Sequence, residues 1–310
     1  MSEFDLKMAK KEISLGFVFT NFNKSALTLQ AVESIYLESK ATSVCEFVIV
    51  IVDNLSRPNE LQILKNGLDQ YEKAILIQNQ DNLGYFAGLN EGIKYLRDNV
   101  IKLDIIIIGN NDLVFPKEFF LRLDLDQINN LNKSVLCPNL ISLDGENQNP
   151  HVLKRISRFR ELVWDLYFSN YYVGCLISFL ANKFRRWLSR KDFKKSDTSG
   201  DIYQGYGACY ILTSKFFANF ETLWSPGFLM GEEFYLAMQL EEIGESMYYI
   251  SNLKVFHHDH ASTSELPNID LWNFARDAHS IYRKFYNPYK LDMRTDQTMS
   301  NFLQASEKDE

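Results

Sequence analysis

Short apolar runs alternate with amphipathic stretches along the first third of the chain. Each run is rich in β-branched residues, and the runs are Leu15–Thr20, Phe47–Val52, Ala74–Ile77 and Ile105–Ile108. The segments VIVIV and IIII are apolar at every position, which is typical of parallel strands that are covered on both faces. Helices are predicted between the runs, at Ser25–Ser39, Asn59–Tyr71 and Ala87–Asn99. This alternation predicts an α/β fold with a mainly parallel central sheet flanked by helices.

The later part of the chain continues with the same kinds of element. A helix is expected after Pro116, and strands are expected at Val135–Pro138, in GACYILT from Gly207, and through Met247–Phe256. Further helices are predicted at Glu232–Ile243 and Asp270–Tyr286. We therefore expect an α/β half at residues 13–150, a helical insertion at 151–200, a second half of the same domain at 201–290, and a weakly ordered tail at 291–310.

Charge is unevenly distributed along the chain. The net charge of −7 argues against a nucleic-acid-binding protein. Residues 151–195, however, hold eleven Lys or Arg and three acidic residues, a net charge of +8, with aromatic residues between them. This segment is interpreted either as a solvated helical pair that packs its aromatic rings on the core, or as a contact with an anionic membrane surface.

The sequence predicts a cytoplasmic location. It contains no run of about 18 apolar residues, and its first residues lack the apolar stretch of a signal peptide. The four cysteines lie far apart without CxxC spacing, so neither a disulfide framework nor a zinc site is expected. If the basic segment binds lipid, the protein would sit peripherally at the inner face of the cell membrane.

Polar residues follow each of the four predicted strands. In sheets of this kind, ligands bind at the carboxyl ends of the strands. The residues to inspect are therefore Thr20–Asn23, Asp53–Ser56, Asn79–Gly84 and Gly109–Asp112. A crevice lined by them suits a polar, charged ligand.

Two of these segments could bind a nucleotide. Asp53 closes the VIVIV strand, where its carboxylate could accept hydrogen bonds from a base or ribose, or could start a turn. The segment Asn82–Gly92 holds small residues at Gly84, Ala87 and Gly88 that would let an anion approach the backbone at a helix start. The same spacing also fits a tight turn with packing glycines, and it is not the GxGxxG of dehydrogenases.

Three further clusters could carry the chemistry. Asn110-Asn111-Asp112 follows a buried strand and offers oxygen ligands to Mg²⁺ or Mn²⁺, although a capped turn has the same composition. Glu232-Glu233 begin a helix, where one could act as a general base or both could simply favour the helix dipole. His257-His258-Asp259-His260 gathers three of the five histidines, which suggests a metal or phosphate contact.

In this order, the motifs resemble glycosyltransferase family 2, the inverting transferases of the GT-A fold, and in particular their rhamnosyltransferase-like bacterial branch. The likeness covers residues 15–130 and 205–265. It is carried by VDNLS, NLGYFAGLNEGI, NND after an apolar strand, GACYILT, the GEE helix start and VFHHDHAST.

The resemblance implies a role for each motif. Asp53, Thr20 and Asn21 would contact the nucleotide, which Asn82 and Gly84 would border. Asn110, Asn111 and Asp112 would replace the family's DxD element, with Asp112 as the metal ligand and His257 assisting the metal or diphosphate. Glu233 would be the catalytic base, and Glu232 would contact the donor. The chain departs from the family pattern at Asn110, Glu233, Tyr235 and Gln239.

The implied function is transfer of a hexosyl or rhamnosyl group from a nucleotide-diphosphate sugar to a glycan or a lipid-linked glycan, in bacterial surface polysaccharide synthesis. Residues 13–150 would bind the nucleotide sugar and 201–290 would hold the acceptor and the base. Two alternatives stay open at this point: a glycoside hydrolase that uses Asp112 and Glu233 as its carboxylate pair, and a sugar-nucleotide-binding module without catalysis. A nicotinamide dehydrogenase lacks its glycine fingerprint here.

Overall fold

The computed structural model describes residues 13–42, 45–100, 102–183, 196–258, 268–290, 292 and 294–301. Its strands are β1 (Ile13–Asn21), β2 (Cys45–Asp53), β3 (Ala74–Gln78), β4 (Ile105–Asn110), β5 (Leu113–Val114), β6 (Val135–Ser142), β7 (Gly200–Ile202), β8 (Cys209–Thr213) and β9 (Met247–His257). Its helices are α1 (Ser25–Thr42), α2 (Pro58–Leu68), α3 (Tyr85–Asn99), α4 (Lys117–Arg122), α5 (Leu125–Leu131), α6 (Arg158–Ser169), α7 (Tyr171–Lys183), α9 (Ser214–Asn219), α10 (Glu232–Glu241) and α11 (Asn268–Phe285).

The described strands form one mixed sheet in the order β3-β2-β1-β4-β8-β6-β9-β5, with β7 paired to β9. Strands β3, β2, β1 and β4 run parallel, as the alternation of strand and helix predicted. Strand β8 runs antiparallel to both β4 and β6, while β6 and β9 are parallel. The expectation of a mainly parallel sheet therefore describes the first half of the chain, and the second half adds antiparallel pairs. The α/β fold with a central sheet flanked by helices is confirmed.

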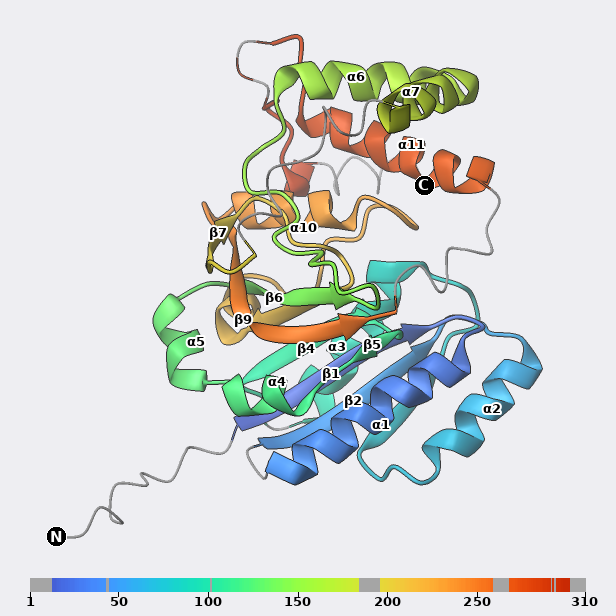
Figure 1. Ribbon diagram of the computed structural model, residues 1–310, viewed down its shortest axis with the longest axis vertical. Helices are drawn as coiled ribbons and strands as arrows, with labels where there is room; N and C mark the ends of the chain where they lie inside the picture. The colour runs from blue at the N-terminus through green and yellow to red at the C-terminus, as the bar shows by residue number, and fades with distance from the viewer. Residues whose placement is uncertain are drawn as a thin grey trace, which may run out of the picture.

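Alternate residues of each central strand enter different cores, which explains why these strands are apolar throughout. Phe17 and Ile51 belong to a core with α1, α2 and α4, whereas Val18 and Val52 belong to a core with α3, α9 and α10. Side chains of successive strand residues point to opposite faces, so both faces must be apolar when both are covered. Figure 1 shows α1 and α2 in front of the sheet and α3 behind it.

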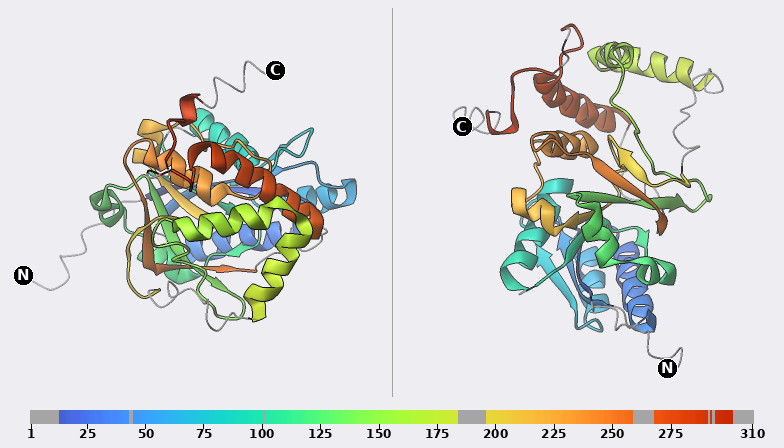
Figure 2. Two further views of the ribbon diagram at one scale, coloured as in Figure 1. Left: turned by 90° about the horizontal axis from the view of Figure 1, so that it is seen from above. Right: turned by 90° about the vertical axis from the view of Figure 1, so that its left-hand side faces the viewer.

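A helical layer lies beyond α10, on the side away from the sheet. Helix α11 packs on α10 through a core that includes Trp224, Tyr235 and Tyr282. Figures 1 and 2 show α6 and α7 stacked on α11 at the far end of the molecule. Glu161 and Asp165 of α6 hold this stack together by accepting hydrogen bonds from Arg283 of α11.

Some predictions concern residues that are only partly described. Residues 184–195 of the basic segment lie outside the described part of the chain, and the tail is described only at 292 and 294–301. Cys137 and Cys209 are buried as free thiols, whereas Cys175 on α7 is exposed. Among the described helices, none is long and apolar enough to cross a membrane.

Candidate active site

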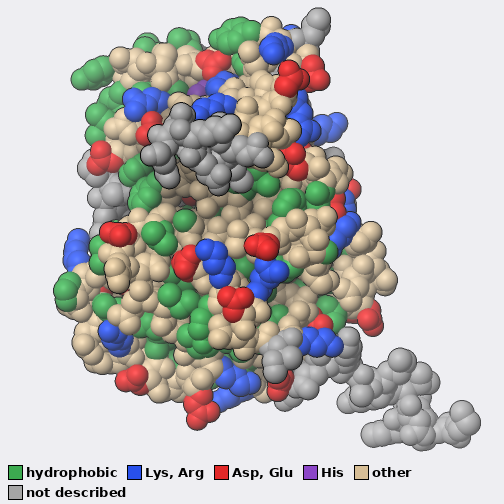
Figure 3. Space-filling model, turned by 180° about the vertical axis from the view of Figure 1, so that it is seen from behind, with side chains coloured by type: hydrophobic (Ala, Val, Ile, Leu, Met, Phe, Trp, Pro, Cys, Tyr) green, Lys and Arg blue, Asp and Glu red, His purple; other side chains and the backbone are tan. Residues whose placement is uncertain are grey.

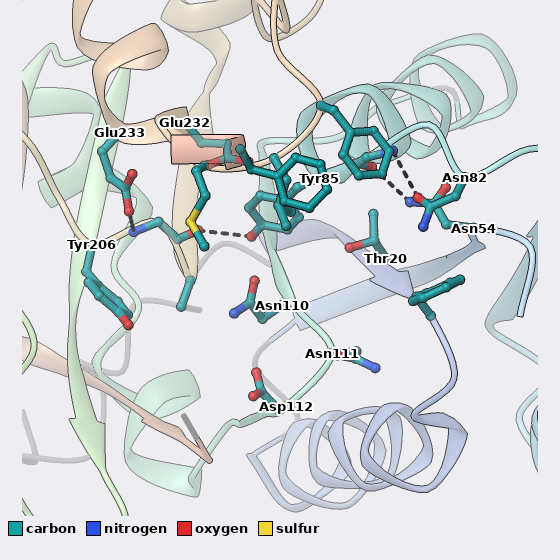
Figure 4. A pocket seen from close by; sticks show the side chains of 18 of the residues that line it. Thr20, Asn54, Asn82, Tyr85, Asn110, Asn111, Asp112, Tyr206, Glu232 and Glu233 are labelled. Atoms are coloured by element: carbon teal, nitrogen blue, oxygen red, sulfur yellow. Dashed lines mark hydrogen bonds between the residues drawn. The ribbon is translucent and has the colours of Figure 1, made fainter. Parts of the chain in front are cut away.

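A cavity of about 560 Å³ lies where β1, β2 and β4 end and where α3 and α10 begin. Figure 4 shows its polar side chains, with Glu233 on one side and Asp112 on the other. Nine of the eleven predicted site residues line it: Thr20, Asn82, Gly84, Asn110, Asn111, Asp112, Glu232, Glu233 and His257. The remaining two, Asn21 and Asp53, are not among its lining residues.

Strand register explains this division. Thr20 pairs with Asn110, and both side chains line the cavity. The next pair along, Asn21 and Asp53, points to the opposite face because side chains alternate along a strand. Both are fully buried, and Nδ2 of Asn21 donates to Oδ1 of Asp53 at 2.7 Å.

The buried pair belongs to a polar network beneath the cavity. The second oxygen of Asp53 accepts the N–H of Ser56, which fixes the turn after β2. Oδ1 of Asn21 accepts the hydroxyl of Thr28 on α1 at 2.7 Å, and Thr28 in turn accepts Nδ2 of Asn111 at 2.8 Å. The network ties β1, β2, α1 and the loop after β4 together, so it holds the floor of the cavity in shape.

The start of α3 forms another wall. Gly84 has a φ of 84°, and a Cβ there would lie 2.0 Å from the carbonyl oxygen of Phe228, so only glycine fits. The Gly84 N–H donates to Oδ1 of Asn82 at 3.0 Å, and its carbonyl accepts Nδ2 of Asn54 at 2.8 Å. The segment predicted to border a nucleotide thus adopts a close turn that places Asn82 and Asn54 at the cavity.

Asp112 and His257 lie side by side at the deep end. Oδ1 of Asp112 is 3.2 Å from Nε2 of His257, and both side chains are almost fully buried. Nδ1 of His257 lies 2.8 Å from Oε1 of Gln148, an acceptor, so Nδ1 carries the hydrogen. In the neutral ring, Nε2 therefore presents a lone pair toward Asp112 and the amide of Asn110, which is 3.4 Å away.

This arrangement fits a divalent cation. Apart from its contact with Nε2 of His257, the buried Oδ1 of Asp112 has no hydrogen-bond partner among the described residues, which is costly unless another group binds it. A carboxylate oxygen and an imidazole nitrogen commonly bind metal ions together. In such sites the other ring N–H of the histidine donates to a fixed acceptor, as Nδ1 of His257 does to Gln148. No group of three or more His, Cys, Asp or Glu suited to a metal occurs among the described residues. A cation here would depend on phosphate and water for its other ligands.

Glu232 and Glu233 begin α10 in different surroundings. Burial, and then the charge of Glu233, raise the pKa of Glu232 to about 8, although backbone N–H groups of Glu232 and Met230 oppose the shift. Glu232 is therefore mostly protonated at neutral pH. Glu233 is half-buried, and its Oε1 accepts the N–H of Gly207 at 3.1 Å. Its carboxylate faces the cavity (Figure 4).

Sequence reasoning missed several residues of the site. Asn54 could have been found from the period of two, because it follows Asp53 and must point the other way. Tyr85 donates its hydroxyl to the Gly207 carbonyl at 2.9 Å and so connects α3 to the strand beside Glu233. The other lining residues not anticipated from the sequence are mostly apolar or aromatic: Phe22, Tyr206, Ala208, Phe228, Leu229, Met230 and Phe274.

Tyr235 and Gln239, two residues at which the chain departs from the family pattern, have structural roles. Tyr235 is buried in the core between α10 and α11. Gln239 is also buried, and its side chain accepts the N–H of Trp224 and donates to the carbonyl of Thr222, each at 2.9 Å. Neither residue lines the cavity.

Comparison with known proteins identifies the family of the chain. The model of the family described as Glycosyl transferase family 2 matches residues 17–195, which is more than half of the chain. No curated protein matches the chain.

One solved structure shares the fold at a TM-score above 0.5, and two others match the chain more weakly. The crystal structure of GalNAc-T7 with UDP, GalNAc and Mn²⁺ has a TM-score of 0.56 and 12% identity, covering 89% of this chain and 49% of that one. The mannosyltransferase PcManGT from Pyrobaculum calidifontis, in complex with GDP-Man and Mn²⁺, has a TM-score of 0.48 and 10% identity, covering 80% of this chain and 58% of that one. For S. aureus TarS the TM-score is 0.44 and the identity 14%, covering 79% and 60%. The fold is thus of the GT-A type, and the chain spans about half the length of GalNAc-T7.

Proposed function

Because the chain belongs to glycosyl transferase family 2, we propose that it transfers a sugar from a nucleotide-diphosphate sugar to an acceptor hydroxyl, with inversion at the anomeric carbon. One observation carries this proposal. A single cavity contains the buried carboxylate of Asp112 beside His257 and, from a different part of the fold, the carboxylate of Glu233. Such a cavity has room for a diphosphate at one end and an acceptor hydroxyl at the other.

Glu233 is the proposed general base. Gly207 holds one of its oxygens, and the carboxylate can accept the acceptor hydroxyl's proton as that oxygen bonds to the anomeric carbon. The bond from the anomeric carbon to the diphosphate breaks in the same step, so the nucleoside diphosphate leaves with the bonding electrons. General-base assistance of this kind is worth about 10²–10⁴-fold in rate.

Asp112 and His257 are the proposed ligands for Mg²⁺ or Mn²⁺. A bound cation would neutralise charge on the diphosphate leaving group. Asn110 and Asn111 are proposed to contact the diphosphate region. The buried oxygen of Asp112 supports this assignment, as does the position of His257, whose Nδ1 lies 2.8 Å from Oε1 of Gln148 and whose Nε2 lies 3.2 Å from Oδ1 of Asp112.

The donor's nucleotide is proposed to lie against Thr20, Asn82, Gly84 and Glu232. Thr20 and Asn82 line the cavity on the side away from Glu233 (Figure 4), which supports this placement. Asn21 and Asp53 were expected to contact the nucleotide directly. Because their side chains are buried and paired, we propose that they act from beneath, by fixing the floor on which it rests.

The role in bacterial surface polysaccharide synthesis, with a hexosyl or rhamnosyl donor and a glycan or lipid-linked glycan acceptor, remains part of the proposal. So does contact of residues 151–195 with an anionic membrane surface. Exposed apolar side chains support that contact, including Phe159, Tyr172 and Phe179, which are 74%, 80% and 65% exposed. Figure 3 shows hydrophobic side chains along the upper edge of the molecule, over this helical layer.

Thermal-shift measurements with a panel of nucleotide sugars and Mn²⁺ test the function. A matching donor at 100 times its Kd stabilises the folded state by about 2.7 kcal/mol. The expected result is a rise in Tm for one class of nucleotide sugar, larger with Mn²⁺ than with a chelator. Released nucleoside diphosphate then separates a transferase from a hydrolase, which needs no nucleotide, and from a module that binds without turnover. A panel that leaves Tm unchanged throughout would contradict the proposal.

A further inference from the structure

A second cavity, of about 510 Å³, lies between the helical layer and the start of α10. Helices α6 and α7 form one side, α11 another, and Met230, Gly231 and Phe234 line the end nearest the candidate active site. This volume is within the range of small-molecule sites in proteins, roughly 300–1,000 Å³.

The wall of this cavity is mainly apolar and aromatic. Trp164 packs edge-on against Phe234 with ring centroids 5.5 Å apart, and Phe234 lies 4.8 Å from Tyr282. Two polar groups of the wall are already engaged. The Tyr282 hydroxyl donates to Glu161 at 2.6 Å, and Nε2 of His279 lies 2.9 Å from Asp165. A ligand here would be held by apolar contact more than by hydrogen bonds.

The two cavities meet at the loop before α10. Met230 lines both of them. Glu233 and Phe234 are neighbours in the first turn of α10, and Glu233 lines the first cavity while Phe234 lines the second. The loop passes close to α11, since a Cβ on Gly231 would lie 2.9 Å from the Cβ of Ala278. Met230 and Gly231 both have positive φ.

We propose that the second cavity binds a hydrocarbon chain of the acceptor, so that an acceptor hydroxyl reaches Glu233 while the chain passes Met230 and lies between α6, α7 and α11. The inference rests on the proposed function and identifies the acceptor as an amphiphile, with a hydroxylated head and an apolar chain. It also gives the helical layer a role in substrate selection.

Binding of alkyl maltosides tests the inference. Octyl and dodecyl β-maltoside differ by four methylenes, and both are titrated into the full chain by calorimetry below their micelle concentrations. Because each buried methylene strengthens binding several-fold, the dodecyl compound should bind about tenfold more tightly or better. Ser178→Trp and Ala275→Trp, which place a large ring in the cavity, should each abolish this chain-length dependence.

Leu176→Trp is the matched control, since Leu176 is on α7, is 57% exposed, and does not line the cavity. It should bind both maltosides as the unmodified chain does. Equal affinity for the two chain lengths, or equal loss in Leu176→Trp and Ser178→Trp, would overturn the inference. Stabilisation by the matching nucleotide sugar is measured on the same variants. If only the inference about the cavity is wrong, the nucleotide sugar still stabilises the unmodified chain. If no nucleotide sugar stabilises the unmodified chain, the proposed function itself is wrong.

Discussion

The backbone N–H of Gly207 lies 3.1 Å from Oε1 of Glu233, and this contact fixes the direction of the proposed base. The Gly207 carbonyl is held in turn by the hydroxyl of Tyr85 at 2.9 Å. Glu233 is thus connected through one peptide segment to the first residue of α3, the helix that begins at the donor side of the cavity. The base and the donor site are therefore positioned by the same short segment.

Substitution of Gly207 by alanine tests this positioning. A Cβ at residue 207 would lie 2.7 Å from Oε1 of Glu233 and would push the carboxylate away. We expect kcat for transfer to fall about tenfold or more, because small displacements of a catalytic group are costly, while donor affinity changes less than about twofold. Steady-state transfer kinetics measure both quantities. Gly200→Ala, where a Cβ meets nothing within 4 Å, is the control and should retain full activity.

Gln148 should control metal affinity without touching the metal. Its Oε1 accepts the Nδ1 hydrogen of His257 and keeps Nε2 directed toward Asp112. Gln148→Leu should weaken binding of Mn²⁺ in the presence of the matching nucleoside diphosphate by about 10–100-fold, as measured by calorimetry. Gln148→Glu, which retains an acceptor for Nδ1, should bind far more tightly than the leucine variant. Equal Mn²⁺ affinity in all three proteins would mean that His257 is not a ligand.

Glu232 should make stability depend on pH. Burial and the charge of Glu233 raise its pKa to about 8 in the folded state, from an ordinary value near 4.5. Between these values the folded chain holds a proton that the unfolded chain releases. The stability that Glu232 contributes is therefore complete below about pH 4.5 and is lost as pH rises toward 8. Its slope is at most about 1.4 kcal/mol per pH unit.

Denaturant unfolding of Glu232→Gln between pH 5 and 9 measures this contribution. The glutamine variant should gain stability relative to the unmodified chain as pH rises, because it has no carboxyl to ionise. A constant difference in the free energy of unfolding over this range would show that the Glu232 carboxyl titrates normally. Glu118→Gln, at an exposed position on α4, serves as a surface control for the charge change, and its stability should follow that of the unmodified chain.

The sequence predicted the first four parallel strands, and most of the predicted site residues line the cavity, for a physical reason. A strand covered on both faces must be apolar at every position, so the runs at β1, β2 and β4 could be recognised without a structure. Their polar ends then had to meet at one edge of the sheet. Thr20, Asn110 and Asp112 lie there because of that topology alone.

The directions of side chains and the pairing of distant strands and helices were harder to predict from the sequence. Asn21 and Asp53 were assigned to the ligand because they end their strands, but residue alternation turns them beneath the cavity. The antiparallel entry of β8 could not be predicted, since its apolar run is compatible with either direction. The second cavity depends on how α6, α7 and α11 stack. That stacking rests on hydrogen bonds from Arg283 to residues more than one hundred positions away.

The central claim is that Glu233 acts as the base for transfer from a donor that binds independently of it. The most direct measurement is the amount of nucleoside diphosphate released in a single turnover by Glu233→Gln, with the matching nucleotide sugar, Mn²⁺ and acceptor present. We predict a loss of about 10²-fold or more in rate, with donor binding by calorimetry nearly unchanged. Release at the rate of the unmodified chain would contradict the account.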